Sequence, residues 1–173
     1  LAEAERTSRT GGREAGIRAA RDHFYRGEMA EEMARFSQRQ GGFLTLEDLR
    51  EFSVKVEEPV VGRFRDYRVY TCGPWCQGPV VAQTLQMLED DDLSALGHNT
   101  ADYIHLVSSA LDLAFADRDQ YYGDPDHVEV PIAGLLSREY TAARRRAVDM
   151  ARAFGEMPPA GDPWRYQDIR GTR

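Results

Sequence analysis

The residue types best suited to chemistry gather in one short loop, residues 71–79, which reads TCGPWCQGP. Its two cysteines, Cys72 and Cys76, stand four residues apart and could close a short disulfide in an oxidising compartment. Cys76 could instead act as a nucleophile with His98 or His105 as its base. No sequence spacing ties either histidine to it, so the favoured interpretation is a cysteine that packs within its loop.

The same loop stands directly before a predicted helix. Backbone N–H groups from Gly73 to Gly78 could therefore hold an anion or an oxyanion at the helix N-terminus. The alternative is a tight corner between a strand and a helix, in which the prolines and Trp75 pack the bend. The density of proline, glycine and tryptophan favours the corner.

A run of acidic residues invites a calcium interpretation. The run consists of Asp117, Asp119, Asp124 and Asp126. An EF-hand loop needs glycine at its sixth position and glutamate at its twelfth, whereas counting from Asp117 places Tyr122 and Val128 there. We therefore expect Asp117 to pair locally with Arg118, and residues 124–126 to form a turn.

Charge and the remaining motifs narrow the possible functions further. The net charge of −7 argues against general nucleic-acid binding. Arg144, Arg145 and Arg146 cannot share one helix face, because neighbours on a helix lie about 100° apart, so we expect a solvated helix face. The four histidines show no zinc spacing. Taken alone, the residues form no complete catalytic set and no metal site.

The bulk composition predicts one folded domain of moderate size. The chain has 173 residues, of which 42% are hydrophobic, enough for a core. No apolar run approaches the roughly 18 residues that a membrane span needs. The chain begins at Leu1 rather than methionine, so we expect that the natural start lies upstream, and a cytoplasmic or a periplasmic or secreted location both stay open.

Hydrophobic periodicity predicts a mostly helical α+β segment with one β-hairpin. We expect helices over residues 14–25, 28–40, 45–52, 79–89, 100–122 and 137–154. We expect strands over 54–63 and 67–72, and an extended stretch over 128–133. The hairpin has no convincing third strand in this chain, so it needs covering helices or a partner sheet. Residues 1–13 are interpreted as a polar lead or linker, 14–154 as the folded segment, and 155–173 as a linker or disordered tail.

Several separated phrases, in order, resemble the C-terminal part of the large subunit of the gamma-glutamyltransferase (gamma-glutamyltranspeptidase) family. They are FYRGEMA from Phe24, GGFLTLEDL from Gly41, YRVY ending at Tyr70, and ADRDQYYGDPD from Ala116. The resemblance runs from about Phe24 to Tyr140. It implies that residues 14–154 form part of an N-terminal-nucleophile (Ntn) hydrolase, a four-layer αββα sandwich built from a self-cleaving precursor.

The resemblance also implies a chemistry. In this family, the threonine that begins the small subunit is both nucleophile and base, takes an acyl group, typically gamma-glutamyl, from a small amide, and passes it to water or an amine. No metal or cofactor is needed. Thr172 does not match the family's nucleophile, which is followed by threonine or serine and a histidine, and the arginine that grips the substrate carboxylate lies before Leu1. The resemblance therefore assigns no catalytic residue to this chain and leaves its substrate contacts open.

The expected partners follow from the same resemblance. They are the remainder of the large subunit, the threonine-bearing small subunit and a small-molecule amide, with neither nucleic acid nor a membrane span. An exposed docking face would also favour homo-oligomers. The family's loop is often rich in proline, serine and glycine, whereas residues 73–79 read GPWCQGP. Another small amide, such as oxamate or a beta-lactam side chain, thus stays open, as do a non-catalytic helical binding module and a cysteine hydrolase using Cys76.

Overall fold

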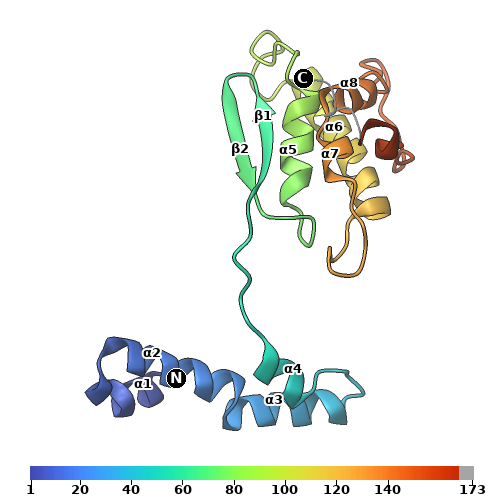
Figure 1. Ribbon diagram of the computed structural model, residues 1–173. Coiled ribbons are helices and arrows are strands. Elements are labelled where there is room, and N and C mark those ends of the chain that lie inside the picture. The colour runs from blue at the N-terminus through green and yellow to red at the C-terminus, as the bar shows by residue number, and fades with distance from the viewer. Residues whose placement is uncertain (168–173) are drawn as a thin grey trace. The chain divides into compact units, whose positions relative to one another are not determined.

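The computed structural model describes residues 1–167 as two compact units, Leu1–Val56 and a second unit from Glu57 onward (Figure 1). Within the described residues, no helix is long and apolar enough to cross a membrane. The α+β class predicted from periodicity is confirmed, because in residues 1–167 helices predominate and a single antiparallel hairpin accompanies them.

The regular elements of the first unit are all helices. It contains α1 (Ala2–Ser8), a 3-10 turn η1 (Arg9–Gly11), α2 (Arg13–Tyr25), α3 (Glu28–Arg39) and α4 (Leu46–Glu51). A capping box opens α4: the Asp48 amide donates to Thr45 Oγ1 at 3.2 Å, and the Thr45 amide donates to Asp48 Oδ2 at 2.7 Å. Residues 1–13, expected as a polar lead, carry α1 and η1, and no residue of α1 is buried.

The second unit begins with the hairpin, β1 (Val60–Phe64) and β2 (Tyr67–Thr71), paired antiparallel from Val60 opposite Thr71 to Phe64 opposite Tyr67. The predicted strand over 54–63 is wrong in its first half, since residues 54–59 pair with no strand and Pro59 has no N–H to donate. Gly62 lies so close to α5 (Gly78–Met87) that an added Cβ would stand 2.6 Å from the Ala82 Cβ. One face of the hairpin is thus covered by α5.

The core of this unit lies where α5 meets the long helix α6 (Ala101–Tyr121). Its buried side chains come from α5, α6 and the segment after α8 (Arg138–Arg145). They are Val80, Met87, Leu88, Leu106, Ala110, Leu113, Ala114 and Val148. The helix predicted over 100–122 is confirmed as α6, which packs against both α5 and α8.

Two predictions near the C-terminal side need correction. The helix predicted over 137–154 ends at Arg145, where β-branched Val148 and a turn closed by the Asp149 carboxylate, which accepts from the Ala151 amide at 2.9 Å, interrupt it. The stretch 128–133, expected to be extended, leads into a short helix, α7 (Ile132–Leu135).

The described part of the expected tail, residues 155–167, contains the 3-10 turn η2 (Pro163–Tyr166). This turn packs against α7 and α8. The Gly134 amide donates to Gln167 Oε1 at 2.8 Å, and the Pro163 side chain is fully buried. These residues therefore contribute to the packing of the second unit.

Candidate functional site

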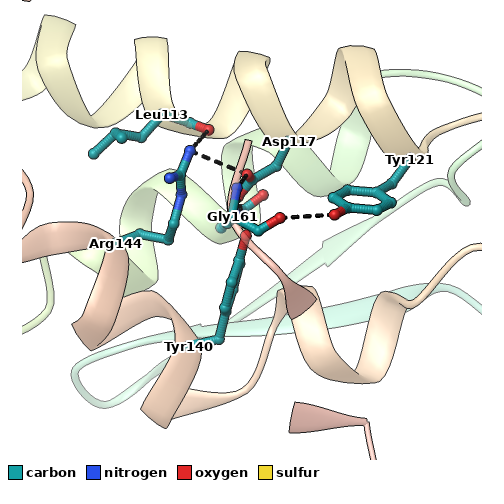
Figure 2. A network of polar contacts seen from close by, with 7 residues as sticks. Leu113, Asp117, Tyr121, Tyr140, Arg144 and Gly161 are labelled. Carbon is teal, nitrogen blue, oxygen red and sulfur yellow. Dashed lines mark hydrogen bonds and ion pairs between the residues drawn. The ribbon is translucent and has the colours of Figure 1, made fainter. Parts of the chain in front are cut away.

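Asp117 is the centre of a buried polar network in the second unit (Figure 2). Its side chain is completely buried. Oδ2 accepts hydrogen bonds from Gln83 Nε2 at 2.6 Å and from the Tyr140 hydroxyl at 2.8 Å. Oδ1 accepts from the Gly161 amide at 2.8 Å and forms an ion pair with Arg144 Nη2 at 3.0 Å. One carboxylate thus joins α5, α6, α8 and the tail.

Arg144 completes the network from α8. Its Nη2 also donates to the Leu113 carbonyl oxygen at 3.0 Å, and only 10% of its side chain is exposed. The expectation of a solvated arginine face is therefore wrong for Arg144, and Arg145 is also engaged, in an ion pair with Asp91 at 2.8 Å. Arg146 is exposed as expected.

The acidic run divides into separate structural roles. The predicted local pair of Asp117 with Arg118 is wrong, because Arg118 pairs with Asp119 at 2.6 Å. The turn predicted over 124–126 is confirmed by the Asp126 amide, which donates to Asp124 Oδ1 at 2.9 Å. Because both oxygens of Asp117 already accept hydrogen bonds from protein donors, this carboxylate serves packing, and it is not open to a substrate or a cation.

The raised pKa values of two tyrosines near Asp117 indicate that its surroundings are of low polarity. Burial, followed by the negative charge of Asp117, holds the pKa of Tyr140 far above its usual value, so this hydroxyl stays a donor. Burial, followed by the charges of Asp162 and Asp117, also raises the pKa of Tyr121, whose hydroxyl donates to the Gly161 carbonyl oxygen at 2.7 Å. Gly161 is therefore held through both its amide and its carbonyl group, which fixes the path of the tail.

The loop before α5 is a closed corner. The Cys76 amide donates to the Gly73 carbonyl oxygen at 3.2 Å, which closes a four-residue turn, and the Gly78 amide points to Cys76 Sγ at 3.4 Å. Trp75 Nε1 donates to Glu57 Oε2 at 2.8 Å. Because these two loop amides already face partners within the loop, the geometry favours the corner over an oxyanion site.

Cys72 and Cys76 are both free thiols, with their sulfur atoms 2.7 Å apart. Neither histidine named as a base is a hydrogen-bond partner of Cys76 in residues 1–167. His105 contacts the Asp149 carbonyl oxygen at 2.8 Å, and the His98 ring lies beside Tyr103. The structure thus brings the two cysteines together but does not form the cysteine–histidine pair.

An open depression of about 260 Å³ adjoins this corner. Its lining includes Trp75, Cys76, Arg118 and Tyr122. The Tyr122 hydroxyl is buried without a hydrogen-bond partner among the described residues, and burial is the main cause of its raised pKa. The Arg118 guanidinium is neutralised by Asp119. This lining supplies a thiol, a phenol and an ion pair, and no nucleophile hydrogen-bonded to a base.

Sequence reasoning missed the role of Asp117, although one signal for it was present. Asp117 follows Leu113 and Ala114 by four and three residues, so it continues the apolar stripe of α6. A carboxylate on such a stripe must find partners when it is buried. The partners themselves lie 23 to 44 residues away, at Tyr140, Gly161 and other positions, and no local pattern indicates them.

Comparison with known proteins shows which protein family this chain resembles. The sequence profile described as Gamma-glutamyltranspeptidase matches residues 13–172. A glutathione hydrolase proenzyme of Bacillus subtilis subsp. natto is 33% identical over 148 residues, which cover 85% of this chain and 25% of that protein. The chain spans about a quarter of the length of the curated relatives it matches.

Solved structures of related proteins also superpose on this chain. A Helicobacter pylori gamma-glutamyltranspeptidase superposes with a TM-score of 0.71 at 30% identity, covering 84% of this chain and 44% of that one. A cephalosporin acylase from Bacillus halodurans superposes with the same TM-score, 0.71, at 32% identity, covering 91% of this chain and 28% of that one. The profile match alone extends over most of the sequence. This chain belongs to the gamma-glutamyltranspeptidase family.

Proposed function

We propose that this chain is the scaffold part of an amidohydrolase that transfers or hydrolyses a gamma-glutamyl or related small acyl amide through a threonine acyl-enzyme. The observation that carries the proposal is the family match over residues 13–172. The relatives named glutathione hydrolase proenzymes supply the reaction class and the idea of a precursor that must be processed.

The proposed chemistry uses a threonine outside this chain. Its hydroxyl attacks the amide carbonyl while its own free amine takes the proton, the amine product leaves, and water or an acceptor amine then releases the acyl group. Thr172 lies outside the described residues, and the amino acid after it is Arg173 rather than the threonine or serine that the family's motif requires. Asp117 is held by a hydrogen bond from Tyr140, and Cys76 contacts the Cys72 sulfur instead of a base, so neither residue is arranged as a nucleophile beside its base.

The hairpin supports the scaffold role. It is two-stranded in the described part of the chain, and Val61, Tyr67 and Tyr70 on it are 44%, 72% and 60% exposed. A lone hairpin with exposed large side chains is marginal in water. We expect strands from the rest of the large subunit and from the threonine-bearing subunit to extend this sheet in the parent αββα sandwich. The same exposed surface predicts self-association of the chain when it is alone.

A second substrate class is favoured by the corner over residues 73–79. Trp75 is 56% exposed and lines the depression beside Cys76, which makes this rim bulkier than the proline, serine and glycine loop that the family resemblance implies. The cephalosporin acylase, to which this chain is 32% identical, is a relative named for a different amide. A beta-lactam side-chain amide is therefore the second candidate donor.

The test is to identify the residue that carries the acyl group during the reaction. A longer protein that contains this chain and the downstream threonine segment is mixed with a gamma-glutamyl anilide, or with a cephalosporin amide, and quenched at early times for peptide mass spectrometry. The proposal predicts an acyl adduct on an N-terminal threonine and none on residues 1–173. An adduct on Cys76, or processed protein that forms no adduct with either donor, would contradict it.

A further inference from the structure

Cys72 and Cys76 have a geometry that the proposed amide chemistry does not use. Their sulfur atoms are 2.7 Å apart, and both are free thiols. A disulfide bond is about 2.05 Å long, so a small approach of the two sulfurs would suffice to join them. We propose that Cys72 and Cys76 are a dithiol oxidation site, which forms a reversible intramolecular disulfide with low-molecular-weight disulfides.

The turn between the cysteines is built to hold them together. The Cys76 amide donates to the Gly73 carbonyl oxygen at 3.2 Å, so residues 73–76 form a turn with Pro74 at its second position. Proline favours that position because its ring fixes φ near −65°. Much of the chain entropy that closing a short disulfide loop costs is therefore already lost in the reduced protein.

Two further features fix the loop. Trp75 Nε1 donates a hydrogen bond to Glu57 Oε2 at 2.8 Å. The backbone at Gly78 also lies close to Cys72, because an added Cβ at Gly78 would stand 2.9 Å from the Cys72 carbonyl oxygen and 3.0 Å from Cys72 Sγ. The absence of a side chain at Gly78 thus lets the start of α5 lie directly against Cys72.

The surroundings assign different roles to the two thiols. The hydrogen bond to Cys76 is the main reason that the pKa of Cys72 is raised. Cys76 Sγ in turn faces the Gly78 amide at the N-terminus of α5, at 3.4 Å, where a partial positive charge favours an anion. We therefore assign Cys76 as the attacking thiolate and Cys72, which is exposed, as the resolving thiol.

The reaction balances with a small disulfide as the oxidant. The Cys76 thiolate attacks one sulfur of the reagent, forms a mixed disulfide and expels one small thiolate. Cys72 then loses its proton and attacks Cys76 Sγ, which expels the second small thiolate. The protein loses two protons and two electrons, and the reagent gains them to become two thiols. An added dithiol reverses the reaction.

The test uses bis(2-hydroxyethyl) disulfide as the probe, with the reduced chain and the variants Cys72→Ser and Cys76→Ser. Intact mass and thiol titration under denaturing conditions follow the products. We expect the wild-type chain to lose both thiols, to carry no adduct and to stay free of intermolecular disulfides. It should do so at reagent concentrations about tenfold below those that modify either single-cysteine variant to the same extent, because the second thiol acts intramolecularly.

The variants test the assigned roles. Cys72→Ser should accumulate a stable mixed disulfide on Cys76, since its resolving thiol is gone, and Cys76→Ser should react more slowly. Circular dichroism checks that both serine variants keep the wild-type helical content. A wild-type chain that accumulates two mixed disulfides, keeps both thiols or forms only intermolecular disulfides would overturn the proposal. None of these outcomes depends on amide turnover.

Discussion

The network around Asp117 and the corner around Cys72 and Cys76 place similar polar groups in opposite surroundings. Asp117 is completely buried, and both of its oxygens are satisfied by donors from three other segments. Cys72 is exposed, Cys76 is half-buried, and their contacts come almost entirely from their own loop. The first region joins distant segments, whereas the contacts of the second lie within one loop.

The difference shows why reactive residue types alone are a poor guide to function in this chain. A buried carboxylate with an arginine resembles a catalytic group in composition, yet its saturation with hydrogen bonds makes it a packing element. A loop cysteine resembles a packing residue, yet its partner sulfur is in contact with it. Hydrogen-bond saturation, and not residue type, separates the two regions.

Removing the carboxylate at the centre of the network should cause the largest loss of folding stability. Asp117→Ala leaves Arg144 buried without its ion pair and leaves the Tyr140 hydroxyl and the Gly161 amide without acceptors. Breaking such a buried pair costs about 3–5 kcal/mol. Urea denaturation followed by circular dichroism measures the loss. Asp119→Ala, on the same helix with an exposed partner, is the matched control and should cost below about 0.5 kcal/mol. Equal losses for both variants would remove the special role of Asp117.

Gly134→Ala tests whether the tail is firmly packed beside this network. An added Cβ would overlap the Pro163 carbonyl oxygen, a backbone atom that can yield only if η2 moves. We expect a loss of about 1–3 kcal/mol, as for other overpacked positions, and faster proteolytic cleavage between residues 155 and 167. Glu139→Ala, exposed on α8, is the control. Unchanged cleavage in Gly134→Ala would show that the tail does not depend on this contact.

Tyr140→Phe removes one donor to Asp117 while keeping the ring. We expect a loss of about 1–2 kcal/mol at neutral pH. The raised pKa of Tyr140 means that the folded state holds this proton more tightly than the unfolded state, whose tyrosines titrate near a pH of about 10. Its contribution is therefore complete below that pH and declines as the pH rises further.

The phenylalanine variant should accordingly lose stability less steeply in the alkaline range than the wild-type chain. Some decline should remain, because the pKa values of Tyr121 and Tyr122 are also raised. Tyr67→Phe, on the exposed end of β2, should reproduce the wild-type pH profile. Identical alkaline slopes for wild type and Tyr140→Phe would contradict the buried assignment.

A substitution in the exposed corner over residues 73–79 should change the free energy of unfolding least. Trp75→Phe removes the hydrogen bond from the indole to Glu57, but both side chains are accessible to water, which can replace it. We expect a change below about 0.5 kcal/mol in the free energy of unfolding. A loss as large as that of Tyr140→Phe would mean that the corner is as tightly integrated as the core.

Helical elements of this chain could be predicted because their signals are local. The helices predicted over 45–52 and 100–122 are both present, as α4 and α6. The end of α8 could not be placed, because arginines continue the helical composition past Arg145 while the stop depends on the turn at Asp149. The strand over 54–59 failed because valines indicate strand propensity, whereas a strand needs backbone pairing with another strand, which residues 54–59 do not form in the part of the chain that the structure describes.

The candidate sites divide in the same way. The nearness of Cys72 and Cys76 was visible in their spacing, and the turn at Asp124 was visible in the dipeptide that follows it. The Asp117 network was not, because Gln83, Tyr140, Arg144 and Gly161 come together only when α5, α6, α8 and the tail pack. Pairings over such sequence separations are products of the tertiary fold.

Release of the aniline from a gamma-glutamyl anilide tests the proposed function most directly. The purified 173-residue chain is compared with a longer protein that carries the downstream threonine segment, and with that protein after substitution of the threonine by alanine. We predict turnover by the longer protein alone, with the isolated chain and the alanine variant at the background rate. Turnover by the isolated chain, or unchanged turnover after the threonine substitution, would contradict the scaffold role proposed for these residues.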